Sequence, residues 1–170
     1  MSLNFKYKNF WFLWISVLVF TSDYISKLLI KNYFTLNREI AHINIIGDLF
    51  RLKFVKNYGA AFSFKFTQNN QLNRYLFIVI IIAACLFIVY LLLTSQKRIQ
   101  NIAYSLVLGG AFGNLYDRIF YGYVVDFLDF DFPDIIMNRW AIFNLADTFI
   151  VVAIIILAVD TIFFKGAKNE

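Results

Sequence analysis

Acidic, basic and amide side chains interrupt the apolar segments of this 170-residue sequence in five short groups. Each ionisable group costs a few kcal/mol to place in a membrane, so each one calls for a partner or a function. Where two carboxyl groups come together, they can share a proton, activate a water molecule and protonate a leaving amine, which is enough to hydrolyse a peptide bond. The five groups are Asp23 with Lys27, Asn57–Ser63, Gly109–Arg118, Val124–Phe127 and Phe143–Thr148.

Thiol, disulfide and zinc chemistry is disfavoured by the composition. The only cysteine is Cys85 and the only histidine is His42, so the chain can form neither an internal disulfide nor a zinc site of histidine and cysteine ligands. We expect no metal and no other cofactor. The formal net charge is +5, but lysine and arginine are scattered beside apolar runs. This distribution favours an anionic membrane surface as a partner and disfavours nucleic acid.

The composition is that of a protein that folds in lipid. Apolar residues make up 61% of the chain and charged residues 16%, and four segments are long enough, or nearly so, to cross a hydrocarbon core of about 30 Å. The third is short, but Gly109 and Gly113 form a small-xxx-small pair that lets another helix pack closely. We therefore predict a single domain, residues 1–170, of the all-α membrane class. The predicted spans are Phe10 to about Ile30, Leu72–Leu93, Ile99 to about Leu115, and Asn144–Phe164.

Four transmembrane helices place both termini on one side of the membrane, together with the short connection between the second and third spans. Basic residues flank the spans on this side, so the positive-inside rule predicts that it is cytoplasmic. Basic residues in the long first connection weaken this bias. The cytoplasmic flanks are Lys6, Lys8, Lys97, Arg98, Lys165 and Lys168, and the opposing residues are Lys31, Arg38, Arg51, Lys53, Lys56 and Lys65.

The long connection between the first two spans contains a strand pattern. Phe50, Leu52 and Phe54 alternate with basic residues, and Gly47-Asp48 follows the apolar segment Ile43–Ile46 as a turn. We predict a small sheet that lies on the outer membrane surface.

Several polar residues have structural explanations. Asp23 and Lys27 are four apart on one helix face, in the favourable order for an ion pair. Asn144 and Asp147 are spaced as an N-cap and its N3 partner. On an up-and-down path, Asp147 is about 5 Å inside the start of its helix and Asp23 about 10 Å inside the end of its own, so both lie in the same leaflet.

Other acids also admit more than one interpretation. Asp117 and Arg118 can mark the water boundary at the end of the third span. Asp160, near the cytoplasmic end of the last span, is expected to be solvated or paired with Lys165. An alternation of acids with phenylalanines can be an interfacial strand or a weak calcium-binding loop, but its spacing does not fit an EF-hand loop, which disfavours calcium; its acids are Asp126, Asp129, Asp131 and Asp134.

Taken together and in order, the five polar groups resemble the motifs of one family, over nearly the whole chain. The sequence resembles the bacterial lipoprotein signal peptidases (signal peptidase II), which are aspartic proteases of the cytoplasmic membrane. The resemblance implies that Asp126 and Asp147 are the catalytic pair. It implies that the substrate is a prolipoprotein whose lipobox cysteine carries diacylglyceryl, cut on the N-terminal side of that cysteine. It also implies an extracytoplasmic cap made of a small sheet and a short helix.

The family's motifs imply a set of residues around the catalytic pair. We hypothesise that Arg118 and Asn57 hydrogen-bond the substrate backbone, and that an Asp23–Lys27 pair holds the first helix in place. Asn114, Asp117 and Asn144 would support these residues. The set is Asn57, Gly59, Asn114, Asp117, Arg118, Asn144, Asp23 and Lys27. We expect a monomer in the inner membrane, surrounded by membrane lipids, with the site at the extracytoplasmic face.

A small proton-coupled transporter is the alternative from a different functional class. Such a protein would also keep acids in the membrane, but near its midplane and often in repeated halves. Here the acids gather at one face and the sequence contains no repeat. Among proteases, the H-E-x-x-H motif of zinc enzymes is absent. A presenilin-like enzyme is a closer rival because Tyr116-Asp117 matches one of its motifs, but its G-x-G-D motif is missing.

Overall fold

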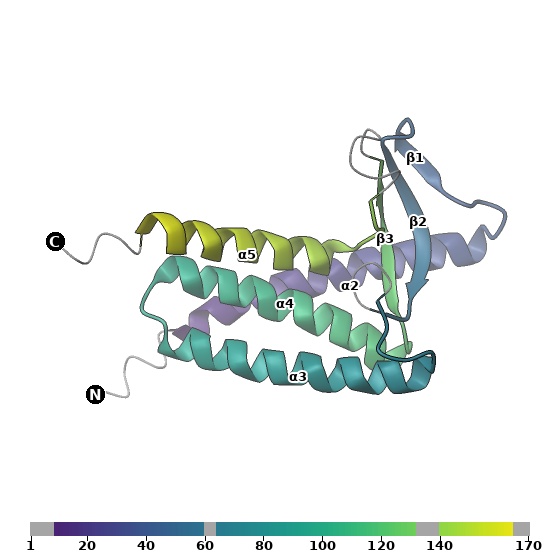
Figure 1. Ribbon diagram of the computed structural model, residues 1–170. Coiled ribbons are helices and arrows are strands. Elements are labelled where there is room, and N and C mark those ends of the chain that lie inside the picture. The colour runs from purple at the N-terminus through teal and green to yellow at the C-terminus, as the bar shows by residue number, and fades with distance from the viewer. Residues whose placement is uncertain (1–8, 60–63, 132–139, 165–170) are drawn as a thin grey trace.

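The protein forms a bundle of four long helices with a small sheet across one end (Figure 1). The computed structural model describes residues 9–59, 64–131 and 140–164. A short 3-10 turn, η1 (Phe10–Phe12), leads into α2 (Leu13–Leu36), and the other helices are α3 (Asn70–Thr94), α4 (Arg98–Phe120) and α5 (Leu145–Phe164). Helix α2 begins and α5 ends at the end of the bundle opposite the sheet.

Three of these helices are long and apolar enough to cross a membrane. The qualifying segments are Phe10–Leu36, Asn70–Thr94 and Leu145–Phe163. Helix α4 corresponds to the predicted third span and has 23 residues, a length of about 34 Å, but its hydropathy is lower. The reason is that α4 contains several polar residues, and these are buried inside the protein: Asn101, Ser105, Asn114, Asp117 and Arg118.

Helix α4 packs closely against its neighbours through its glycines. A Cβ atom added at Gly109 would lie 2.6 Å from Cβ of Val19 and 2.7 Å from the carbonyl oxygen of Ser16. A Cβ atom at Gly113 would collide with the carboxylate of Asp23. Both contacts are with α2, so the close helix packing expected from the Gly109/Gly113 pair is confirmed.

Two helices continue beyond their predicted ends. Helix α2 extends from Ile30 to Leu36, where the Asn37 side chain donates to the carbonyl of Tyr33 and the helix ends. Helix α4 extends past Leu115 to Phe120. The prediction ended α4 at the first polar residues. These residues have hydrogen-bond partners inside the bundle, so they can be buried without ending the helix.

The sheet contains three antiparallel strands in the order β1-β2-β3. The strands are β1 (Ile43–Ile46), β2 (Phe50–Asn57) and β3 (Val124–Phe130), and Gly47, with φ of 49°, supplies the turn between the first two. The predicted strands of the long connection are thus confirmed. For the acid–phenylalanine alternation the strand interpretation holds through Phe130, and Asp134 lies outside the described residues.

The short helix of the expected cap is not found among the described residues, where the four long helices and η1 are the only helical elements. At the other end of the bundle, the prediction for Asp160 needs correction. Its side chain is only 5% exposed and accepts from Nζ of Lys97 at 2.9 Å and from Nε2 of Gln100 at 2.8 Å. Lys97 replaces solvent as its partner, and Lys165 lies outside the described residues.

The packing at Gly109 predicts the effect of a single methyl group. In an exposed helix Gly→Ala stabilises by about 1 kcal/mol, but here the new methyl group would overlap Val19 and the backbone of α2. We expect Gly109→Ala to lower the free energy of unfolding by about 1–3 kcal/mol, the usual range for overpacking. Phe112→Leu on the same helix is the control, because Phe112 is 42% exposed. Unfolding in detergent micelles, followed by circular dichroism, measures both; a Gly109→Ala protein as stable as the wild type would contradict the packing argument.

Candidate active site

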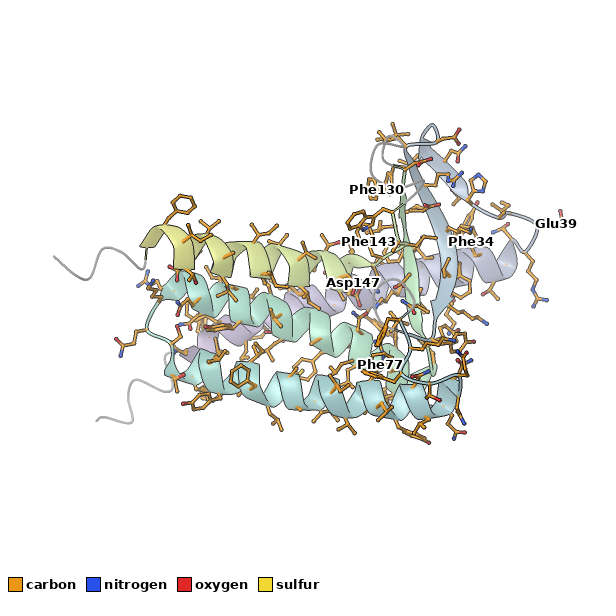
Figure 2. All side chains as sticks on the ribbon, in the orientation of Figure 1. Phe34, Glu39, Phe77, Phe130, Phe143 and Asp147 are labelled. Atoms are coloured by element: carbon orange, nitrogen blue, oxygen red, sulfur yellow. The ribbon has the colours of Figure 1, made fainter. Side chains whose placement is uncertain are left out.

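All ten residues singled out in the sequence meet where the sheet joins the bundle, the region in which Figure 2 labels Asp147. They come from α2, the end of β2, the last turns of α4, β3 and the start of α5. Hydrogen bonds and ion pairs connect them into one network. Its members are Asp23, Lys27, Asn57, Gly59, Asn114, Asp117, Arg118, Asp126, Asn144 and Asp147.

Strand register brings Asn57 to Asp126. Asp126 pairs with Val55 across the sheet, and Asn57 is two residues further along on the same face, so the two side chains are diagonal neighbours. Nδ2 of Asn57 donates to Oδ2 of Asp126 at 2.9 Å. The Asn57 Oδ1 atom accepts from the backbone N–H of Gly59 at 2.8 Å. Because that N–H can only donate, it turns the amide so that its NH₂ group faces the acid.

Asn144 connects the two candidate acids. Its Oδ1 atom accepts from the backbone N–H of Asp147 at 3.0 Å, and Oδ2 of Asp147 accepts from the backbone N–H of Asn144 at 3.3 Å. This reciprocal pair is the predicted cap of α5. Nδ2 of Asn144 is then free to face β3, where it donates to Oδ1 of Asp126 at 2.7 Å. One residue therefore touches both carboxyl groups.

Asn114 supports the second acid from α4. Its Nδ2 atom donates to Oδ1 of Asp147 at 2.9 Å, while its Oδ1 atom accepts from Nζ of Lys27 at 3.0 Å. An ammonium group can only donate, so Lys27 determines which way the Asn114 amide points. Lys27 thus acts on Asp147 through an amide and makes no ion pair with either candidate acid in the described network.

The charge of Lys27 is shared by two other carboxylates. Nζ lies 2.7 Å from Oδ2 of Asp23 and 3.1 Å from Oδ2 of Asp117, and all three side chains are at most 2% exposed. The predicted Asp23–Lys27 pair is therefore present. Both acids also hold backbone: Asp23 accepts from the N–H of Ala146 at 2.9 Å, and Asp117 accepts from the N–H of Val125 at 3.0 Å. These contacts fix the start of α5 and the segment that precedes Asp126.

Arg118 holds the chain segment that follows β2. Its guanidinium group donates to the carbonyl of Gly59 at 2.7 Å and to the carbonyl of Asn114 at 3.2 Å, and it lies over the ring of Phe77. The sequence led us to expect Arg118 and Asn57 to bind the substrate backbone. In the structure both side chains have partners inside the protein, and their contact with a substrate stays a prediction.

Two further contributors were missed in the sequence. Arg74 donates to the carbonyls of Arg118 and Ile119, both at 2.7 Å, and so caps the end of α4. Arg51 of β2 pairs with Asp129 of β3 at 3.2 Å and ties the two strands together. Arg74 did carry a signal, since it is a lone charge at the start of an apolar span. The Arg51–Asp129 pair depends on strand register and has no local signal.

Burial makes Asp126 a weak acid. Only 3% of Asp126 is exposed. This burial and the nearby charge of Asp147 raise the pKa of Asp126 to about 7. The hydrogen bonds from Asn57 and Asn144 and the charge of Lys27 lower the pKa, but their effect is smaller. Asp126 therefore changes charge near neutral pH. A carboxyl group of this kind can give up or take a proton under working conditions.

The fold and site define a helical membrane protein that brings two carboxyl groups together at the junction of its bundle and sheet. A family model described as signal peptidase (SPase) II matches residues 15–163. The chain belongs to the signal peptidase II family.

Individual relatives agree with this assignment. The chain is 42% identical over 138 residues to the lipoprotein signal peptidase of Pasteurella multocida (strain Pm70), covering 80% of this chain and 79% of that one. It is 37% identical over 161 residues to the lipoprotein signal peptidase of Haemophilus influenzae (strain PittGG), covering 94% and 88%. Among solved structures, a bacterial membrane enzyme determined by the in meso method at 2.3 Å resolution matches with a TM-score of 0.78 at 25% identity, over 94% of this chain and 92% of that one.

The coupling between the two acids can be measured directly. In the wild-type protein we expect the Asp126 carboxyl to lose its proton at pH of about 7. Asp147→Asn removes the like charge, so the pKa of Asp126 should fall, but not to its ordinary value, because burial is the larger cause of the shift. Infrared difference spectroscopy across pH follows the protonated carboxyl band, and Asp126→Asn identifies it. A band that titrates near pH 4 in the wild type would contradict the assigned burial.

Proposed function

We propose that this membrane peptidase removes the signal peptide of prolipoproteins by an aspartic mechanism, with Asp126 and Asp147 as the catalytic pair. The names of the relatives, lipoprotein signal peptidases, support the substrate class. The observation that carries the mechanism is the contact of one residue, Asn144, with both carboxyl groups. The cut falls on the N-terminal side of the diacylglyceryl-modified lipobox cysteine.

The different surroundings of the two acids favour different roles. Asp147 is partly exposed and lies in the first turn of α5, where the helix dipole stabilises negative charge. It takes a proton from the attacking water as the water oxygen bonds to the scissile carbonyl carbon. Asp126, buried and protonated near neutral pH, donates its proton to the leaving nitrogen as the C–N bond breaks. One proton is accepted and one is given, so the charges of the pair are exchanged when the C–N bond breaks, and transfer of a proton from Asp147 back to Asp126 restores the starting state.

Asn57, Asn114 and Asn144 hold this pair through N–H groups that reach all four carboxyl oxygens, with the backbone N–H of Asn144 serving one of them. Each oxygen has two lone pairs, so an oxygen that accepts from an amide can still carry the catalytic proton. Lys27 and Arg118 act as positioning residues. The first orients Asn114, and the second anchors Gly59, whose N–H orients Asn57.

We place the protein in the bacterial inner membrane as a single domain with four spans, of which α4 is the third along the chain. Helix α4 runs antiparallel to α3 within the bundle (Figure 1), and its buried polar residues are shielded from lipid by the other helices. The site then lies at the extracytoplasmic ends of the helices, with both termini in the cytoplasm. There, a lipid-anchored substrate reaches the acids from the bilayer while water reaches them from outside.

Replacing either acid should abolish cleavage. Asp126→Asn and Asp147→Asn keep the shape of each side chain but remove proton transfer, for which a loss of about 10²–10⁴-fold or more is expected. The measurement is cleavage of a diacylglyceryl-modified lipobox peptide in detergent micelles. Asp160→Asn is the matched control, a buried acid on the same helix as Asp147 but at its other end, and it should retain activity. Full cleavage by either dyad variant with normal melting behaviour would overturn the proposed pair.

The pH profile should report Asp126. Because the proton donor is lost as Asp126 ionises, the cleavage rate should fall as pH rises through about 7. The Asn57 hydrogen bond lowers the pKa of Asp126, so Asn57→Ala should move this alkaline limb to higher pH. Gln71→Ala, which removes an exposed amide at the start of α3, should leave the limb unchanged. A limb that moves to lower pH in Asn57→Ala would contradict the role given to Asp126.

A further inference from the structure

Three lysines and three tyrosines form a continuous surface feature beside the candidate site, which we call the Lys–Tyr row. The lysines come from α2, β2 and the segment before α3, and the tyrosines follow β2 and α4. The members are Lys31, Lys56, Lys65, Tyr58, Tyr121 and Tyr123.

The rings of the row are in contact with one another. The ring centroids of Tyr58 and Tyr123 are 5.7 Å apart, and those of Tyr121 and Tyr123 are 6.1 Å apart. On the bundle side, Tyr121 continues to Tyr116 at 6.0 Å, and Tyr116 to Tyr24 at 5.1 Å. The aromatic surface thus runs from the flanks of α2 and α4 to the end of β2.

Each tyrosine of the row carries one ammonium group over its ring. Nζ of Lys31 lies 3.6 Å from the centroid of Tyr121, Nζ of Lys56 lies 5.1 Å from Tyr123, and the corresponding distance from Lys65 to Tyr58 is 5.8 Å. A ring face attracts a cation without cancelling its charge. The lysines are therefore held in position with their positive charge still available to an anion.

No carboxylate of the described chain neutralises these lysines, since none of the ion pairs found there involves them. The partial negative charge at the end of α4 does not account for them either. Arg74 already binds the carbonyls of Arg118 and Ile119 at that helix end. The row therefore presents a surplus of positive charge on the face where the positive-inside rule would predict little.

The position of the row matches a membrane interface. Phe120, at the end of α4 and in ring contact with Tyr116, is 64% exposed. Tyr58, next to the sheet, is 37% exposed. Tyrosine and lysine both prefer the zone between hydrocarbon and water, where the ring lies among headgroups and the ammonium group meets phosphate.

We infer that the Lys–Tyr row is a binding site for the phosphate groups of anionic phospholipids in the leaflet on the sheet side. Bound headgroups would seat the sheet on the membrane surface. They would also steady the segment that carries Tyr58, which lies between Asn57 and Gly59, the two residues that orient the amide against Asp126. The inference concerns lipid binding and does not depend on the proposed cleavage reaction.

The test compares two double variants of the full chain that lose the same charge. Lys31→Gln/Lys56→Gln removes two ammonium groups of the row, and Arg38→Gln/Lys53→Gln removes two cations outside the row, from the segment between α2 and α3. Native mass spectrometry of the protein in detergent, titrated with phosphatidylglycerol or phosphatidylcholine, measures lipid binding. At about five-fold per lysine, the row variant should bind phosphatidylglycerol about 25-fold more weakly, while the control pair stays within about two-fold of the wild type.

Three results would overturn the inference: equal weakening in both double variants, unchanged binding in the row variant, or wild-type binding of phosphatidylcholine as tight as that of phosphatidylglycerol. Thermal unfolding of each variant shows whether it folds. If the Lys31→Gln/Lys56→Gln protein does not fold, the single variants Lys31→Gln and Lys56→Gln replace it. Each is expected to weaken binding about five-fold. Lys31→Arg/Lys56→Arg keeps the charge and should keep the binding.

Discussion

The buried ammonium group of Lys27 is the interaction on which the site's geometry depends. It lies among Asp23, Asp117 and Asn114, and it and both acids are almost completely buried. Burying a charge in this way is costly unless every partner is present, and removal of one partner leaves an uncompensated charge. The cluster therefore tolerates few alternative arrangements of α2 and α4. The same acids hold the backbone of Ala146 and Val125, so this constraint passes directly to the segments that carry Asp147 and Asp126.

The orientation of each of the three asparagine side chains is set by a group that can only donate a hydrogen bond. Lys27 sets Asn114, the N–H of Gly59 sets Asn57, and the N–H of Asp147 sets Asn144. In each case the amide oxygen is occupied, so the NH₂ group must face a carboxyl group. An aspartate in place of any of these asparagines would have the same shape but would bring an acceptor against an acceptor. This explains why amides, and not further acids, surround the pair.

Those parts of the fold that depend on local pattern could be predicted from the sequence. The apolar lengths predict α2, α3 and α5, the alternation after Gly47 predicts β2, and the four-residue and three-residue spacings predict the Asp23–Lys27 pair and the cap of α5. The end of α4 could not be predicted, because its polar residues stop the helix only if they face lipid or water. Whether they do depends on which helices surround them.

Contacts between distant segments explain the remaining differences. Asn57 meets Asp126 because of strand register, and Arg118 meets Gly59 because the segment that follows β2 lies beside α4. Neither contact can be inferred from the sequence around the residues that make it. The partner of Asp160 is a similar case: Lys97 is 63 positions away in the sequence but adjacent in the bundle. The resemblance to a family supplied the site residues, but only the fold shows which of them touch the acids and which contact the acids through another residue.

The two candidate acids end in unlike surroundings for reasons that lie in the secondary structure itself. Asp126 is on a strand whose side chains are buried against the bundle, so its charged form loses solvation. Asp147 is in the first turn of a helix, where the helix dipole favours an anion, and it is partly exposed. A pair of chemically identical side chains is thereby made unequal before any substrate arrives. In the proposed mechanism, this inequality lets one acid hold a proton while its neighbour holds a charge.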